Sequence, residues 1–291
     1  MNVFSILSNP KLPLDLTDDQ YNRATHREYP YVRTGDDGKP RHYALCPECN
    51  NAVQLVNRSL SSTESLTLYA KHINFSLSDL AEYDQDEYEE CQLANPHRFD
   101  GMIRRKSGKK SNRIREFFSK HIDLIINFAE TITGIKFSDK TIECMISEFC
   151  KSRGYEYRAV SEFNLPIAFV YMTEAKNLYG SSVNSQIADA INNKSEGFEV
   201  NKSTYKHSFI SKKKGYYESE LKIFFSNHSI PSNDKMANES VMMYISEIKK
   251  GQLPENAPII FDKKITLDKR FFYHTINRRE RFQGMVKSNI E

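Results

Sequence analysis

The chain has 291 residues, of which 39% are hydrophobic, 12% aromatic and 27% charged, with 11 Gly and 10 Pro. These proportions exclude a wholly disordered or fibrous chain. Its longest apolar stretch, 165–172, is far shorter than the ~20 residues of a membrane-spanning helix, and its N-terminus lacks the basic and apolar regions of a secretory signal. We therefore expect a cytoplasmic protein with no membrane partner.

Charge is distributed unevenly along the chain, whose net charge is +3. Residues 1–100 contain 9 Lys or Arg and 16 Asp or Glu, whereas the remaining residues contain 32 and 22. Such asymmetry is typical of a protein whose basic part faces a polyanion. Lys-rich helix faces that are merely solvated would produce the same balance.

Two of the five cysteines, Cys46 and Cys49, form the sequence Cys-Pro-Glu-Cys. An odd number of cysteines argues against a disulfide framework. A tight turn with this spacing directs both thiolates at one metal ion. Redox exchange, the other role of Cys-x-x-Cys, would place the motif at the start of a helix, but residues 52–56 alternate as a strand. Metal binding is the favoured interpretation.

The residues after this knuckle predict a β-hairpin, with strands near 52–57 and 66–70 and a Ser-rich turn over 59–65. A hairpin returns its second strand beside the first, so it would bring His72 next to the knuckle. Cys91 and His97 follow an acidic, helix-like stretch, 80–90, and either could complete a tetrahedral site. We expect a structural Zn²⁺ ion whose ligands are Cys46, Cys49, His72 and Cys91, with His97 as the alternative.

Residues 43–49, the pair Ala52-Val53 and residues 68–72 together resemble the zinc-ribbon-like N-terminal segment of CoiA-like competence proteins. In that family a Cys-x-x-Cys knuckle precedes a short hairpin ending in a His-Phe-x-His-like element, and a nuclease-like domain often follows. Tyr69 stands where the first His of that element would fall, so only His72 matches. The resemblance implies a bacterial, DNA-associated protein.

Residues 101–115 form a basic joint that contains Gly and Ser, and we place a domain boundary there. The expected organisation is a zinc-ribbon-like module over 1–100, a basic linker over 101–115 and a mainly α-helical domain over 116–291, which is an α+β fold class.

Apolar residues at three- and four-residue spacing predict helices near 114–132 and 142–150, and further helices near 184–193, 217–227 and 238–250. A polar loop is expected over 194–214. A strand near 258–261 and a basic segment over 269–287 complete the chain.

Basic residues in the second part gather in three clusters, the last two beside aromatic residues such as Tyr216 and Phe271. Lys and Arg neutralise phosphates, and neighbouring rings stack on unpaired bases. The candidate nucleic-acid-binding residues are Arg104, Arg105, Lys109, Lys110, Lys212, Lys213, Lys214, Arg278, Arg279 and Arg281. If these residues are scattered in space they are only solvated surface.

Glu174-Ala175-Lys176 follows the apolar run 167–172. If that run were a strand, Glu174 and Lys176 would resemble the catalytic pair of PD-(D/E)XK nucleases, in which the carboxylate holds Mg²⁺ and the lysine activates water. A second carboxylate is missing unless Glu156 or Glu162 serves. Apolar spacing over 168–179 favours a helix instead.

Three functions follow from these features. Nucleic-acid association is the preferred prediction, and the resemblance to CoiA-like proteins implies a role in DNA processing or in defence against mobile DNA. A metal-dependent nuclease that uses Glu174 and Lys176 is the first alternative. The second alternative is a protein-interaction adaptor, in which an acidic surface of the N-terminal module binds a basic partner or the basic half of the same chain. Its residues would be Asp84, Asp86, Glu87, Glu89 and Glu90.

Overall fold

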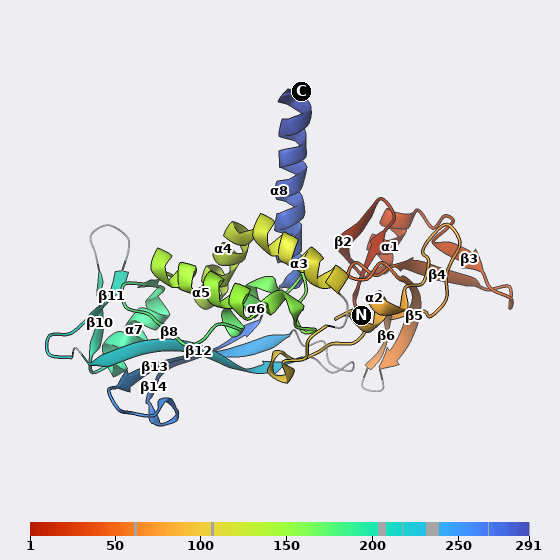
Figure 1. The fold of residues 1–291 in the computed structure, drawn as a ribbon. Helices are drawn as coiled ribbons and strands as arrows, with labels where there is room; N and C mark the ends of the chain where they lie inside the picture. Colours follow the sequence, from red (N-terminus) through yellow and green to blue (C-terminus); the bar gives the residue numbers. More distant parts are fainter. Residues whose placement is uncertain are drawn as a thin grey trace. The chain divides into compact units, whose positions relative to one another are not determined.

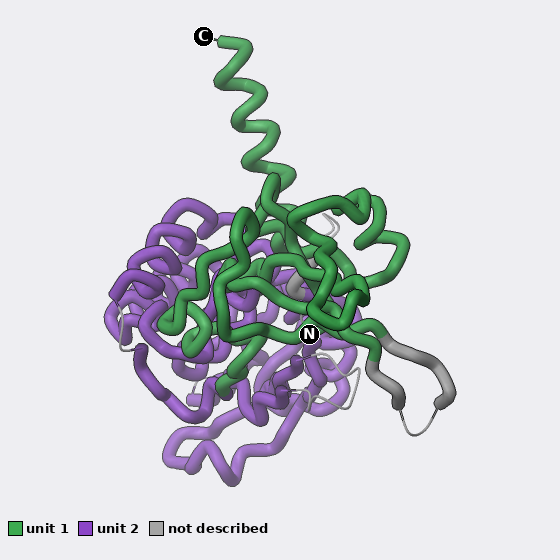
Figure 2. Tube along the Cα trace, turned by 90° about the vertical axis from the view of Figure 1, so that its right-hand side faces the viewer, with its two compact units in different colours: residues 1–97, 269–291 green, residues 98–268 purple. Residues whose placement is uncertain are grey.

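The computed structural model describes residues 1–60, 63–105, 108–202, 208–216, 218–230, 239–266 and 268–290 (Figure 1). Contacts within the chain group it into two compact units, shown in different colours in Figure 2. Unit 1 comprises Met1–His97 and Lys269–Glu291, and unit 2 comprises Arg98–Asp268. The division into independently folding domains at 101–115 stays a prediction.

Unit 1 is built on an antiparallel sheet of six strands within the described residues. They are β1 (Val3–Ile6), β2 (Asn9–Asp15), β3 (Val32–Thr34), β4 (Pro40–Leu45), β5 (Ala52–Leu60) and β6 (Thr63–His72). The strand order is β2-β1-β4-β5-β6, and β3 pairs with β4. Three helices accompany the sheet: α1 (Asp18–Thr25), α2 (Gln85–Glu89) and α8 (Lys269–Ile290). Two separate apolar clusters line the sheet, one of which contains the three cysteines Cys46, Cys49 and Cys91.

The predicted hairpin after the knuckle is confirmed by the antiparallel pairing of β5 with β6. Val53 pairs with His72 in this register, so His72 lies across from the start of β5. Both strands run further than the sequence predicts, and part of the expected turn, residues 61–62, lies outside the described residues. The register therefore carries the end of β6 back to the knuckle that precedes β5.

Unit 2 combines five α-helices with two antiparallel sheets in the residues that are described. The helices are α3 (Gly108–Lys120), α4 (Ile122–Thr133), α5 (Asp139–Lys151), α6 (Leu165–Tyr171) and α7 (Ser185–Lys194), with 3₁₀ turns η1 (Phe99–Gly101), η2 (Gly154–Glu156) and η3 (Pro254–Asn256). The strands are β7 (Ile135–Lys136), β8 (Lys176–Asn177), β9 (Ser182–Val183), β10 (Phe198–Lys202), β11 (Ser208–Lys212), β12 (Ser219–Ser229), β13 (Ser240–Lys249) and β14 (Ile259–Thr266). One sheet has the order β10-β11-β9-β7 and the other β14-β13-β12-β8.

The core of unit 2 lies between its helices and the β12–β14 sheet. Figure 1 shows α4, α5 and α6 along one side of these strands, and α6 contacts β12 while α4 and α7 contact β14. Three phenylalanines from α3, α5 and α6, namely Phe118, Phe149 and Phe169, pack with ring centroids 4.8 to 5.8 Å apart. Burial of such a side chain contributes ~1.5–3 kcal/mol to stability.

The predicted fold class, a zinc-ribbon-like module followed by a mainly helical domain, is wrong. Over the residues that the structure describes, the protein is a mixed α/β protein with three antiparallel sheets, and strands dominate its N-terminal region. The segments expected as helices near 217–227 and 238–250 are the strands β12 and β13, as far as they are described, and the expected loop over 194–214 contains β10 and β11.

The reason for this error lies in the two faces of β12 and β13. Leu221 and Ile223 on β12, and Val241 and Met243 on β13, are buried and recur at every second residue, which is the period of a strand. The opposite face carries further apolar residues, among them the stacked pair Phe224 and Tyr244. Apolar side chains on both faces obscure the alternation and imitate helical spacing.

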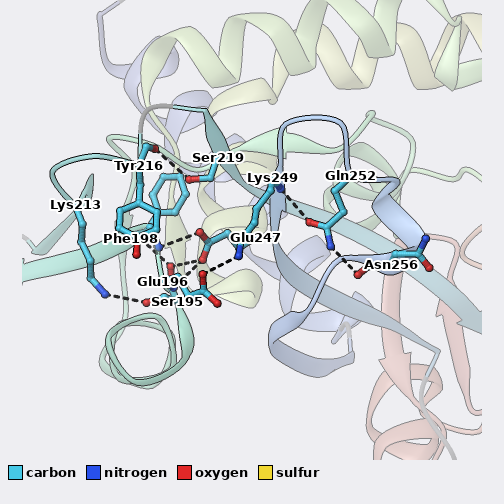
Figure 3. Close-up of polar contacts among 11 residues, drawn as sticks. Ser195, Glu196, Phe198, Lys213, Tyr216, Ser219, Glu247, Lys249, Gln252 and Asn256 are labelled. Carbon is cyan, nitrogen blue, oxygen red and sulfur yellow. Dashed lines mark hydrogen bonds and ion pairs between the residues drawn. The ribbon is translucent and has the colours of Figure 1, made fainter.

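A buried carboxylate joins β13 to the connection between α7 and β10 (Figure 3). Glu247, only 2% exposed, accepts hydrogen bonds from the Ser195 hydroxyl at 2.7 Å and from the backbone N–H groups of Glu196 and Gly197 at 3.0 and 2.9 Å. The Ser195 hydroxyl in turn accepts from the N–H of Phe198 at 2.9 Å. Both carboxylate oxygens of Glu247 and the Ser195 hydroxyl thereby have hydrogen-bond partners, as burial requires.

We expect Gly134→Ala to destabilise unit 2 by about 2–3 kcal/mol. Gly134 follows α4 with φ +75°, and an added Cβ would overlap the side-chain amide of Asn184. Gly180→Ala is the matched control, because Gly180 has φ +77° but open space around it, so only the ~1 kcal/mol conformational penalty applies. Equal losses for both variants in urea unfolding would contradict the steric explanation.

Candidate metal centre

The knuckle is formed where β4 turns into β5. β4 ends at Leu45, and residues 46–49 form a tight turn in which the N–H of Asn50 donates to the carbonyl of Cys46 at 2.9 Å. Asn50 has φ +60°, a conformation that Asn adopts more readily than most residues. The N–H of Cys46 donates to the carbonyl of Asn51, also at 2.9 Å. This turn directs both cysteine side chains to the same side.

The other two donors arrive from separate elements. His72 is the last residue of β6, and Cys91 follows α2, whose first turn is capped by the Asp84 carboxylate. The side chain of Asn51 pairs with the backbone of Asp84 through two hydrogen bonds, of 2.9 and 2.7 Å. Asn51 is 1% exposed, so this pair fastens the segment leading to Cys91 onto the knuckle.

One donor atom from each of Cys46, Cys49, His72 and Cys91 lies within 4.8 Å of all the others. The separations are 3.7 Å between the sulfurs of Cys46 and Cys91, 3.4 Å from Cys49 Sγ to His72 Nε2, and 3.8 Å from Cys91 Sγ to His72 Nε2. A tetrahedral ion with Zn–S of ~2.3 Å and Zn–N of ~2.0–2.1 Å separates its ligands by about 3.8 Å (S to S) and about 3.5 Å (S to N). The four residues fit a tetrahedral metal ion such as zinc.

The electrostatics of the group favour a cation. Cys46 and Cys91 are completely buried and Cys49 is 4% exposed. Burial raises the pKa of the Cys46 and Cys91 thiols, whereas hydrogen bonds from these two thiols lower the pKa of Cys49. Burial therefore disfavours the thiolate forms of Cys46 and Cys91, and a dication between the three sulfurs would stabilise all three thiolates.

Sequence reasoning missed Glu48, which lies inside the knuckle and is 3% exposed. Its Oε2 accepts the N–H of Leu93 at 3.1 Å and lies 3.8 Å from Cys91 Sγ, and its carbonyl accepts from the Lys11 ammonium at 2.8 Å. Glu48 thus positions the chain that follows Cys91. The sequence signal that could have revealed this role is the acidic residue within Cys-Pro-Glu-Cys, because a solvent-exposed turn does not require a carboxylate at this position.

His97, the alternative to Cys91, is not a member of the group among the described residues. Its backbone N–H donates to the Gln92 side chain at 2.8 Å. Cys91 belongs to the group instead: it follows Glu90, the C-cap of α2, and its N–H donates to the carbonyl of Tyr88 at 3.2 Å.

Several of the predicted nucleic-acid-binding residues have structural partners within unit 2. Arg104 pairs with Glu156 at 2.9 Å and lies over the ring of Tyr157, and Arg105 donates to backbone carbonyls of the segment 155–160. Lys110 is buried, and Lys213 donates to the carbonyl of Ser195 at 2.8 Å, as Figure 3 shows. Arg104, Arg105 and Lys213 therefore have intramolecular partners, and Lys110 is not at the surface.

The remaining predicted basic residues lie in different places. Lys109 at the start of α3 and Lys214 after β11 are exposed, and Lys212 lies over the ring of Phe198 with 5.8 Å from Nζ to the ring centre. Arg278 and Arg281 are exposed and Arg279 is partly exposed, all on α8 of unit 1. The predicted set therefore divides between the two units.

The structural context of Glu174 and Lys176, the proposed nuclease pair, differs from the one that the PD-(D/E)XK motif requires. Residues 165–171 form helix α6, so Glu174 follows a helix rather than a strand. Lys176 on β8 forms an ion pair with Glu148 of α5, and the N–H of Glu174 donates to the same carboxylate at 3.1 Å. Glu174 is exposed and belongs to no three-membered Cys, His or carboxylate group within the described part of the chain.

We expect Glu148→Gln to destabilise unit 2 by about 2 kcal/mol at neutral pH, because Lys176 loses its charged partner. Burial alone would raise the pKa of Glu148, but bonds from Lys176, Cys144 and the N–H of Glu174 outweigh it, so its pKa lies below the usual 4.5. A lowered folded-state pKa means that this stabilisation is present above the usual pKa and is lost as the pH falls through the folded value.

The difference in the free energy of unfolding between wild type and Glu148→Gln should therefore become smaller when urea unfolding is repeated at pH values below 4.5. Glu218→Gln, which removes an exposed ion pair with Lys250, is the control and should change little. A constant difference at all pH values would show that the carboxylate charge contributes nothing.

No described helix is both long and apolar enough to cross a membrane. Comparison of the chain with protein-family models, with curated proteins and with solved structures found no match.

Proposed function

We propose that Cys46, Cys49, His72 and Cys91 hold one structural Zn²⁺ ion in a protein that associates with nucleic acid. The observation that carries the metal assignment is the convergence of four donor atoms within 4.8 Å of one another. Three thiolates and one imidazole form a ligand set typical of zinc, and four protein ligands leave no open position for water or substrate. The ion would therefore stabilise the fold rather than catalyse a reaction.

Metal analysis of the purified full-length chain tests this assignment. We expect one zinc per chain, and much less than one in Cys91→Ser. His97→Ala and Cys144→Ser should keep the full content, because His97 stands outside the group and Cys144 is an exposed cysteine on α5 of unit 2. A wild-type chain without stoichiometric transition metal would refute the proposal.

Nucleic-acid association is supported by the charge of α8. Residues 269–290 contain six Lys or Arg and one acidic residue, Glu280. The resemblance of the knuckle and hairpin to the N-terminal segment of CoiA-like competence proteins points to the same class of partner, and DNA processing or defence against mobile DNA would be the biological setting. Nuclease activity is not part of the proposal, because Lys176 is engaged with Glu148.

The association predicts a steep dependence on salt, since phosphate neutralisation releases counterions. Fluorescence anisotropy with labelled DNA and RNA should show the dissociation constant rising strongly as salt increases from low to moderate concentration. Reversal of charge at two exposed positions, in Arg278→Glu with Arg281→Glu, should abolish binding. Binding that does not respond to salt, or no binding at all, would exclude this function.

A further inference from the structure

Helix α8 has two parts with different surroundings. Near its start Phe272, Tyr273 and Ile276 are buried, and the helix contacts β2 of the same unit. From residue 281 to residue 290 every position is exposed. Figure 2 shows this part of α8 standing clear of the rest of unit 1. Unit 1 therefore anchors the base of the helix and leaves its distal part, residues 278–290, open to a partner.

The distal part is basic as well as exposed. Arg278, Arg281 and Lys287 are exposed, Arg279 is partly exposed, and the only acidic residue in the range 278–290 is Glu280. Several cations close together on one helix create a positive electrostatic potential around it. A polyanion is the partner that complements this charge.

The same surface also presents large apolar side chains. Phe282, Met285 and Val286 are 45%, 52% and 57% exposed. The guanidinium carbons of Arg278 and Arg281 lie 5.4 and 5.3 Å from the centre of the Phe282 ring. Phosphate binding needs only the cations, so the exposed ring requires another explanation. Stacking of bases on an aromatic ring beside arginines supplies one, and it requires unpaired bases.

A second copy of the chain fits this surface less well. The apolar residues extend only over 282–290, about 13 Å of helix, which is short for a stable helix pair. A parallel pairing of two copies would also bring Arg278 and Arg281 of each copy near the same residues of the other, and like charges repel.

Resting on the proposed association with nucleic acid, we propose that the distal part of α8 binds single-stranded nucleic acid, with Phe282 stacking on a base and Arg278, Arg281 and Lys287 contacting phosphates. This assignment predicts a preference for single strands over duplex. It also separates two kinds of residue: Phe282 contributes to single-strand binding only, whereas the basic residues contribute to both.

The test uses the full chain and three labelled probes in anisotropy titrations: an oligodeoxythymidylate, an oligouridylate of the same length and a DNA duplex. We expect tighter binding to one or both single strands than to the duplex. Phe282→Ala should weaken single-strand binding about 5- to 150-fold, the range that corresponds to ~1–3 kcal/mol of stacking, and should leave duplex binding nearly unchanged. The two single-stranded probes distinguish DNA from RNA.

Phe209→Ala is the matched control, because Phe209 on β11 of unit 2 is 50% exposed and carries the same side chain. It should bind all probes like the wild type. Lys287→Gln should weaken single-strand and duplex binding together and lower the slope of log affinity against log salt by about 0.7–0.9.

Each other result overturns a defined part of the proposal. Salt-dependent binding that Phe282→Ala does not weaken, or equal affinity for the duplex, rejects the stacking surface and leaves the proposed association standing. Self-association in sedimentation velocity that Phe282→Ala abolishes identifies the surface as a contact between copies and likewise rejects it. No binding to any probe refutes the proposed association itself.

Discussion

Removal of the proposed metal ion by a strong chelator is expected to unfold unit 1 around the cluster. The four donors come from the β4–β5 turn, the end of β6 and the segment that follows α2, so one ion held by them would cross-link three separate segments. Structural zinc sites bind with apparent free energies of ~10–16 kcal/mol, which equals or exceeds the ~5–15 kcal/mol that stabilises a whole domain. The three thiolates would also lose the cation that balances their negative charge.

Hydrogen exchange measures this effect locally. In the chelated protein, amides near the cluster, such as Val53 and Ala70, should lose their protection, whereas amides of β12 and β13 in unit 2 should keep theirs. Val53 and Ala70 are 0% and 1% exposed, so their protection reports the fold of the sheet. Retained protection at both positions would show that the sheet does not depend on an ion.

Cys49→Ser and Cys144→Ser form a matched pair for the same prediction. Both replace a thiol by a hydroxyl, but Cys49 is buried in the cluster and Cys144 is exposed on α5. Serine is a poor zinc ligand, so Cys49→Ser should lower the metal content and the melting temperature of unit 1. Cys144→Ser should leave both unchanged. If the two variants have the same metal content and melting temperature, the cluster does not stabilise unit 1.

The second large effect is expected for Glu247→Ala in unit 2. The substitution leaves the Ser195 hydroxyl and the N–H groups of Glu196 and Gly197 without an acceptor in a buried junction. Each unsatisfied buried group costs about 1–3 kcal/mol, so we expect a loss of about 4 kcal/mol in the free energy of unfolding. Unit 2 should begin to unfold at markedly lower urea concentration.

Two further variants define the cause. Glu247→Gln keeps the shape but has one acceptor oxygen instead of two, so its loss should be about 1–3 kcal/mol. Glu196→Gln removes the ion pair with Lys249, in which both side chains are more than half exposed, and should have no measurable effect. If Glu247→Ala is no more destabilising than Glu196→Gln, the junction shown in Figure 3 does not stabilise unit 2.

The candidate metal site was largely predictable because its signals are local. The spacing of Cys46 and Cys49 defines a knuckle, and the hairpin that follows has a register that returns His72 to it. The fourth ligand was not decided, since Cys91 and His97 both follow the acidic stretch. The short helix α2 and the hydrogen bonds between its N-cap residue Asp84 and Asn51 decided it, and such a contact between distant segments has no pattern in the sequence.

The strands of unit 2 were less predictable. β12 and β13 have apolar residues on both faces, so neither the period of a helix nor that of a strand stands out. Their antiparallel pairing, with Ile223 opposite Ile245, is what makes both segments strands. The aromatic pair Phe224 and Tyr244 becomes meaningful only when that pairing brings the rings to 5.3 Å.

The sequence by itself determined the Cys-x-x-Cys knuckle of the candidate metal site, the hairpin that follows it and the basic character of α8. Each of these depends on residues that are close in the chain, whose spacing constrains their geometry directly. Only the tertiary structure decided that Glu148 is the partner of Lys176, that Glu247 closes the α7–β10 junction and that Cys91 joins the cluster. These contacts join segments far apart in the chain, and burial makes them selective because an unpaired polar group inside the protein is costly.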